Sequence, residues 1–249
     1  MQFSMQTVLG LVTLLAFSDA THTCLDGYGC ARYPANCGDT GQAACDIVVN
    51  WQADDADGIQ FTTQAKTTGT NPRWLGIGFS EDKEMGQDDI LICRQTDNQA
   101  DVVLEHYWSV GPPNSTTKSI VKETASITAD GLTNVVTAQD EGYVICNFTR
   151  AVMVPGKDHV YDLSKTTTAD MMPFYYWFIG TGSVVSDAPQ QHDVDPYIST
   201  AAIDYTATGE QMVEPGSSEE GSDSHEAASN IMASMMLLVV MTCLAIYLH

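Results

Sequence analysis

The sequence predicts an all-β protein folded as an antiparallel β-sandwich. Short runs with strand character recur between residues 46 and 208, and turn-forming Gly, Pro, Asn and Asp residues separate them. No long segment carries the periodicity of a helix. Many short strands at regular spacing are typical of a sandwich. The expected strands are 47–51, 59–65, 73–80, 90–94, 102–108, 132–138, 143–148, 159–163, 174–180 and 197–203.

Changes in composition divide the 249 residues into five segments. Residues 1–20 are expected to be a secretory signal, because an apolar run is followed by small residues and is too short to span a membrane. The other segments are a Cys-rich lead-in (21–45), the sandwich (46–208), a stalk (209–230) and an apolar tail (231–249). The sandwich segment has the length of one domain with its own core.

The cysteines indicate a disulfide framework. The mature chain after the signal holds an even number of cysteines before the apolar tail, and a secreted chain folds in an oxidising compartment. The spacing fits no zinc site, and the absence of a CxxCH motif means that any heme would be held without covalent attachment. Six cysteines allow 15 pairings, and the sequence does not choose among them. They are Cys24, Cys30, Cys37, Cys45, Cys93 and Cys146.

The stretch 73–93 carries the main functional signal. Bulky Leu75, Ile77 and Phe79 alternate with a nearly bare face that includes Gly76 and Gly78. Two glycines on one strand face suggest that something flat or bulky lies against it. The loop 81–89 that follows has five carboxylates and one apolar residue, Met85.

This stretch resembles a known family. GIGFS, a short acidic gap, MG and DD before a strand are similar to the DOMON domain, which has an immunoglobulin-like sandwich architecture. The resemblance is nearest to the DOMON domain of ferric-chelate reductase-like proteins, and the run CDIVVNW at the end of the lead-in also resembles that group. The resemblance to the cytochrome domain of cellobiose dehydrogenase is more distant. It implies a b-type heme held by a Met in this loop, Met85, and by a downstream His.

His192 is the histidine that the resemblance selects. It lies in a polar loop after the aromatic strand 174–180, where the family has its heme ligand. His106 shares a strand face with apolar residues, so a buried core histidine is the default there, and His159 follows a Pro-Gly turn and is expected to be exposed. The aromatic residues Tyr175, Tyr176 and Trp177 either line a heme pocket or simply pack.

Met and His ligation favours electron transfer. The soft thioether raises the reduction potential, and two filled axial positions leave no open site for substrate. The leading hypothesis is therefore a cell-surface cytochrome domain that passes electrons, including to ferric or cupric chelates, from a separate donor in the membrane or outside the cell. No GxGxxG motif or catalytic triad points to a complete reductase. The alternative is a heme-free module that binds sugar or protein.

The surface and the C-terminal tail give further expectations. Sequons at Asn114 and Asn147 fit N-glycosylation, and the carboxylates of 54–58 are spaced for a hairpin turn rather than for calcium. The apolar run 231–248 lacks a flanking Lys or Arg, which favours a GPI signal over a transmembrane helix, with Ser222 as the attachment site or 216–218 as the alternative. A net charge of −22 excludes nucleic acid as a natural partner.

Overall fold

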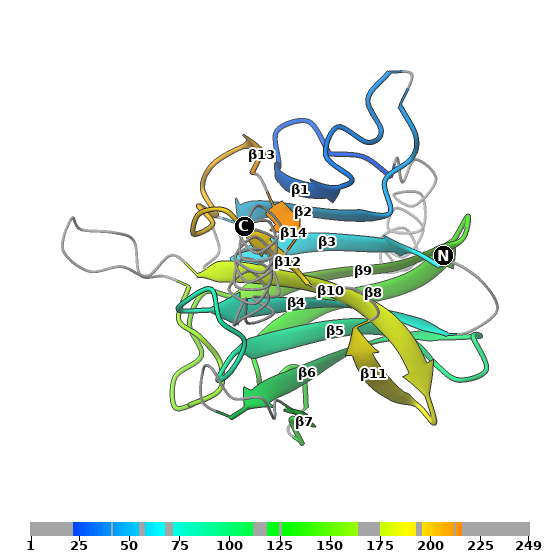
Figure 1. Cartoon of the computed structure of the whole chain (residues 1–249). Coiled ribbons are helices and arrows are strands. Elements are labelled where there is room, and N and C mark those ends of the chain that lie inside the picture. Colours follow the sequence, from blue (N-terminus) through cyan, green and yellow to red (C-terminus); the bar gives the residue numbers. More distant parts are fainter. Residues whose placement is uncertain are drawn as a thin grey trace, which may run out of the picture. The chain divides into compact units, whose positions relative to one another are not determined.

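The computed structural model describes residues 22–40, 42–54, 58–67, 72–111, 119–124, 126–163, 175–192, 196–211 and 213–215. All of them belong to one unit, Met1–Gly216. Within them the chain is all β-strand with turns and loops, and no helix is present (Figure 1). The predicted all-β class is confirmed. The expected signal, most of the stalk, the apolar tail, Asn114 and Ser222 lie outside the described residues.

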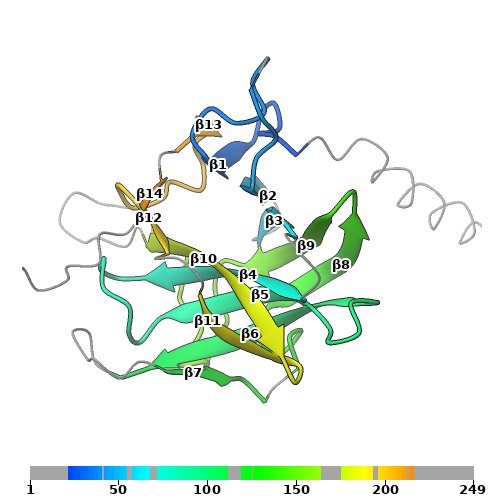
Figure 2. The same ribbon diagram turned by 45° about the vertical axis from the view of Figure 1, so that its right-hand side comes forward.

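Two sheets make up the sandwich (Figure 2). The first has the order β13-β1-β2-β3-β9-β8, and the second has the order β14-β12-β10-β4-β5-β6-β7, with β11 paired to β10. The first sheet contains β1 (Gly29–Tyr33), β2 (Ile47–Asp54), β3 (Gly58–Lys66), β8 (Leu132–Asp140), β9 (Tyr143–Ala151) and β13 (Gly209–Glu210). The second contains β4 (Arg73–Ser80), β5 (Asp89–Gln95), β6 (Val102–Val110), β7 (Ser119–Lys122), β10 (Tyr176–Val185), β11 (Ala188–His192), β12 (Tyr197–Ser199) and β14 (Val213–Pro215).

The core lies between the two sheets and follows the predicted alternation. Leu75, Ile77 and Phe79 of β4 are buried there. They meet aromatic side chains of the first sheet, and Phe61 and Phe79 contact edge to face with ring centroids 6.1 Å apart. Burying such side chains contributes about 1.5–3 kcal/mol each. The core therefore fixes which face of β4 points outward.

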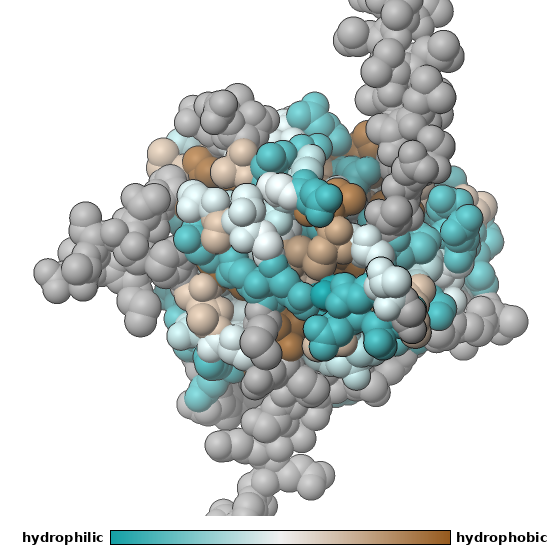
Figure 3. Space-filling view, turned by 90° about the horizontal axis from the view of Figure 1, so that it is seen from above, coloured by the Kyte–Doolittle hydropathy of each residue, from teal (hydrophilic) through white to brown (hydrophobic). Residues whose placement is uncertain are grey.

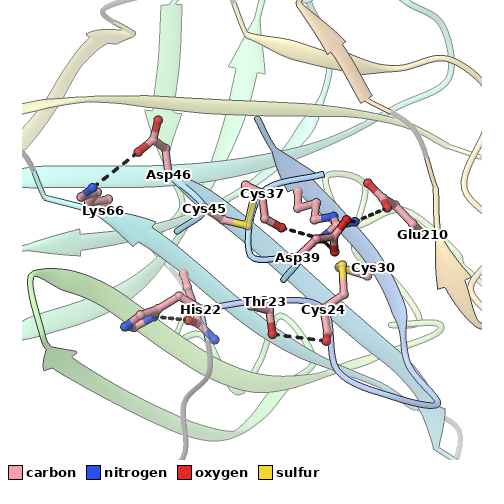
Figure 4. The surroundings of a disulfide bond; sticks show 12 residues. His22, Thr23, Cys24, Cys30, Cys37, Asp39, Cys45, Asp46, Lys66 and Glu210 are labelled. Carbon is pink, nitrogen blue, oxygen red and sulfur yellow. Dashed lines mark hydrogen bonds and ion pairs between the residues drawn. A yellow bond between two sulfur atoms is a disulfide. The ribbon is translucent and has the colours of Figure 1, made fainter. Parts of the chain in front are cut away.

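Three disulfides close the framework: Cys24–Cys30, Cys37–Cys45 and Cys93–Cys146. The disulfide-rich lead-in is confirmed, and the third bond joins β5 of one sheet to β9 of the other. In the lead-in Arg32 forms ion pairs with Asp39 (2.7 Å) and Glu210 (2.9 Å) and donates a hydrogen bond to the carbonyl of Cys37. Figure 4 shows Asp39 and Glu210 near the Cys37–Cys45 bond. This clasp ties the lead-in to β13.

Several strands differ from the sequence-based expectation. Residues 159–163 form no strand, because Tyr161 N–H donates to the side chain of Asp89 (3.0 Å) instead of to a neighbouring strand. The lead-in contains β1, and β7 was not predicted. The first residues of the expected stalk, 209–215, contain β13, which pairs with β1, and β14, which pairs with β12.

Candidate functional site

The outer face of the second sheet carries a row of small residues across two strands. Gly76 of β4 lies opposite Gly180 of β10, and Gly78 lies opposite Phe178. Because side chains alternate along a strand, this face is turned away from the core that Leu75 and Ile77 fill. The bare strand face expected from the sequence therefore continues into β10.

A cavity of about 620 Å³ lies over this face. Its volume is in the range of small-molecule and cofactor sites. Most of the lining is apolar or glycine, with a few amide, hydroxyl and carboxyl groups. The lining residues are Trp74, Gly76, Gly78, Met85, Asp88, Ile90, Ile92, Ser109, Ser119, Ile120, Phe178, Gly180, Gln190, Gln191, His192 and Pro196.

Met85 lines this cavity from the loop between β4 and β5, and its side chain is half-buried. The loop is held by hydrogen bonds around it. Gly86 N–H donates to the carboxylate of Asp88 at 2.6 Å, and Gln87 N–H donates to the carbonyl of Ser109 at 2.9 Å. Gln87 has a positive φ of 63°, which lets the chain turn back into β5. The loop that carries the thioether of Met85 is thus held in place by hydrogen bonds.

His192 lines the same cavity from the last position of β11. It lies in a strand and not in the polar loop that the sequence predicted, because β11 forms a hairpin with β10 in which His192 is opposite Gly182. Ser186 and Asp187 at the hairpin turn have φ of 53° and 58°, as a tight two-residue turn requires. The structure therefore brings Met85 and His192 to one cavity from segments about a hundred residues apart.

The residues present fit a heme. The donor set is one soft thioether and one imidazole, a pair found at heme iron. The apolar side chains of Trp74, Ile90, Ile92 and Phe178 suit a flat macrocycle. Ser109 lines the cavity as well, and its buried hydroxyl has no hydrogen-bond partner among the described residues. Such a group is costly to bury unless a water or a polar atom of a ligand pairs with it.

Trp74 already covers part of the bare face. A Cβ at Gly76 would lie 3.0 Å from the indole, and one at Gly182 would lie 2.6 Å from its nitrogen. At Gly78 an added Cβ would meet only ordinary contacts, 3.4 Å from Phe178 and 3.6 Å from Ile90. The sequence suggested that a bulky group lies against the glycines, and part of that group is the indole of Trp74.

The predicted aromatic residues take other places. Tyr175 and Trp177 are buried in the core between the sheets, and Tyr176 lies under the ammonium group of Lys83, 5.1 Å from its ring centroid. None of the three lines the cavity, so they pack. Sequence reasoning missed most of the apolar lining, including Phe178, whose position two residues from Gly180 places it on the outer face.

The other three histidines in the described part of the chain have partners elsewhere. His106 is buried between Asp89 and Asp130, and His159 stacks on Trp108 with ring centroids 4.5 Å apart. His22 stacks on Tyr143 at 3.5 Å. None of these three lines the cavity.

A charged network borders the cavity's apolar side. Glu105 accepts hydrogen bonds from Arg94 (2.8 Å), Lys122 (2.6 Å) and the hydroxyl of Tyr107 (2.7 Å). Burial alone would raise the pKa of Glu105, but these donors outweigh it and lower the pKa to about 2. Glu105 therefore stays ionised, and Tyr107 packs with Trp74, Ile90 and Ile92.

The face of the molecule seen from above mixes polar and apolar residues. Figure 3 shows hydrophilic and hydrophobic residues intermingled on the face seen from above.

In the described part of the chain no group of three or more His, Cys, Asp or Glu is arranged to hold a metal ion. The described segments also contain no helix with the length and apolarity to cross a bilayer.

The fold and the site define an all-β sandwich module with a ligand cavity on the outside of one sheet. Residues 43–175 match the DOMON domain, and this match spans more than half of the chain. The chain belongs to the DOMON domain family.

Known relatives are similar to most of this chain. The chain is 30% identical to the DOMON domain-containing protein FRRS1L of Mus musculus over 169 residues, which cover 67% of this chain and 48% of the relative. It is 24% identical to ferric-chelate reductase 1 of Homo sapiens over 205 residues, 80% of this chain and 30% of the relative. It thus spans about half or less of these relatives. No solved structure matches.

Proposed function

We propose that this protein binds heme b through Met85 and His192 and passes electrons outside the cell. The observation that carries the proposal is that both side chains line one largely apolar cavity. When bound, the heme would supply a one-electron couple whose potential the thioether raises. With Met85 and His192 as its two protein ligands, the heme would transfer electrons and leave bond-making chemistry to a partner.

The partner is proposed to be a separate redox protein or a metal chelate. Two relatives are named ferric-chelate reductase 1, which supports ferric chelates as acceptors. Cupric chelates are proposed as further acceptors. Glu81, Asp82 and Glu84 are exposed on the loop that carries Met85. Their negative charge would favour the approach of a cationic partner. The protein is proposed to act as an electron-transfer module whose donor is another molecule.

A cell-surface location belongs to the same proposal. The sequence patterns support removal of residues 1–20, glycosylation at Asn114 and Asn147, and GPI attachment at Ser222. The side chain of Asn147 is half-buried on β9, so glycosylation there would require its amide to reach solvent.

The competing function is a heme-free module that binds sugar. Gln190, Gln191 and Ser119 line the cavity, and amides and hydroxyls suit sugar hydroxyl groups. The absorption spectrum of the secreted domain, expressed with adequate heme, distinguishes the two functions. A sharp Soret band at one heme per chain, with the split visible bands of a low-spin six-coordinate iron after reduction, supports heme binding. Protein that takes up no stoichiometric heme refutes it.

A further inference from the structure

Trp74 connects the floor of the cavity to the strand that carries His192. Its indole is buried and lies along the glycines of β4 and β10, since added Cβ atoms at Gly180 and Gly182 would fall 3.3 and 2.6 Å from it. Any larger side chain at Gly182 would push the indole away. The glycines therefore form a trough that holds the ring in one place.

The indole nitrogen is also tied to β11. Trp74 Nε1–H donates to the carbonyl oxygen of Gln190 at 3.0 Å, two residues before His192. The pairing of β11 with β10 is irregular between Gly182 and Val184, and Pro189 of β11 has no N–H to donate. The Trp74 bond therefore supports β11 where its own ladder is weak.

A second tie holds the opposite end of the hairpin. At the turn, Asp187 accepts from Asp97 N–H at 2.9 Å and forms an ion pair with Arg94 at 3.2 Å. This tie lies five residues from His192 and fixes the turn. The hydrogen bond from Trp74 is thus the nearer of these two ties to His192.

We propose that Trp74 is a positioning residue that holds β11 so that the imidazole of His192 faces the cavity. The proposal deepens the heme-binding function proposed above and rests on it for the role of His192. The hydrogen bond sets where the strand runs, and the indole forms the adjoining wall of the cavity.

The test compares Trp74→Phe with Tyr107→Phe. Trp74→Phe keeps an aromatic ring in the trough and removes the indole N–H. Tyr107→Phe is the matched control, because Tyr107 belongs to the same outer-face cluster and its lost hydroxyl bond, 2.7 Å to Glu105, is not made to β11. Glu105 keeps Arg94 and Lys122 as partners, so the ion pair of Arg94 with Asp187 at the turn is expected to stay in place. Each change removes one hydrogen bond and keeps an aromatic ring, so both variants are expected to fold. Trp74→Phe also leaves part of the trough unfilled, so its loss of stability is expected to be the larger of the two.

The first readout needs no heme. Amide hydrogen exchange over 188–192 is expected to be roughly threefold to tenfold faster in Trp74→Phe than in wild type, and unchanged in Tyr107→Phe. Equal exchange in Trp74→Phe and wild type would overturn the proposal, and so would the same increase in both variants. Faster exchange in protein that takes up no heme would uphold the tie while refuting the proposed function.

The second readout is spectroscopic. Heme-loaded Trp74→Phe is expected to show a high-spin fraction that added imidazole converts back to low spin, because His192 leaves the iron more readily. Tyr107→Phe is expected to keep the wild-type spectrum. Suppose that wild type binds heme through His192 and that Trp74→Phe keeps the low-spin spectrum unchanged. This result would overturn the positioning role and leave the proposed heme site intact.

Discussion

The imidazole of His106 lies 3.1 Å from the carboxylate of Asp89, and both side chains are buried. The other ring nitrogen of His106 lies 2.9 Å from Asp130, and Asp89 is also paired with Arg150. Burial alone would lower the pKa of His106, but its hydrogen bonds to the two carboxylates outweigh burial and raise the pKa. Burial would raise the pKa of Asp89, yet Arg150 and His106 lower it.

The first prediction concerns the pH dependence of stability. A raised folded-state pKa means that His106 contributes its full stabilisation below the unfolded pKa of about 6.5 and loses it as the pH rises through the folded value. The free energy of unfolding should therefore fall above about pH 6.5, by at most about 1.4 kcal/mol per pH unit. Denaturant titrations between pH 5 and 9 measure this slope.

The control for that slope is His106→Gln, which keeps a neutral donor. It should be less stable than wild type at pH 6 by about 1–3 kcal/mol, since one partner of a buried pair is lost. Its slope above pH 6.5 should vanish. On the acid side both proteins should lose stability as the pH falls through the lowered pKa of Asp89. Identical slopes above pH 6.5 would contradict the assignment to His106.

The sequence pattern of residues 73–93 predicted much of β4 and of the cavity's position. The alternation in 73–80 placed β4 with its correct bounds, and it assigned Leu75 and Phe79 to the core. A Met at the tip of a polar loop next to a bare face pointed to the side of the sheet where the cavity lies. These features depend only on residues that are neighbours in the sequence, so they can be predicted without knowing the fold.

The rest depends on contacts between distant segments. That Trp74 fills the trough over Gly180 and Gly182 requires knowing that β4 pairs with β10. The strand β1 escaped prediction because it lies among the Gly and Pro residues of the lead-in, and it is stabilised by pairing with β2 and β13. The disulfide pairing likewise followed from the fold and not from the spacing of the cysteines.

The second prediction concerns the part of the cavity floor that Trp74 leaves bare. Gly78→Ala should fold with nearly wild-type stability, because the added methyl meets only ordinary contacts. Gly78→Val should stay folded and weaken heme uptake by at least about tenfold, since its branches occupy the cavity. Heme titrations followed at the Soret band, together with thermal melts, measure both effects.

Gly76→Ala is the comparison for this series. Its methyl would press on the indole of Trp74 at 3.0 Å, so it should lower thermal stability more than Gly78→Ala does. If Gly78→Val binds heme as tightly as wild type, the ligand does not lie against this part of the sheet.

The third prediction concerns the anchor. A GPI-linked chain ends at its attachment site, so phosphatidylinositol-specific phospholipase C should release the protein from intact cells. Ser222→Leu should reduce this surface pool if Ser222 is the attachment site, whereas a change at Ser217 should leave it unchanged. Protein that stays on the membrane and yields peptides from 231–248 by mass spectrometry would indicate a transmembrane anchor instead.

The last prediction separates the two proposed ligands by the order of their effects. Met85→Ala should keep heme, open one axial position, admit carbon monoxide to the reduced iron and lower the midpoint potential, because the thioether is the weaker ligand and favours the reduced state. His192→Ala should lose most of its heme, since only a thioether would remain. Absorption spectra, carbon monoxide difference spectra and redox titration follow these changes.

A structural control guards against nonspecific uptake by an apolar surface. His106→Gln alters a buried histidine that does not line the cavity, so whatever heme it retains should keep the wild-type spectrum. Retention of that spectrum in both Met85→Ala and His192→Ala would refute the ligand pair, even if the cavity holds heme. A greater loss of heme in Met85→Ala than in His192→Ala would reverse the predicted order and make the thioether the dominant anchor.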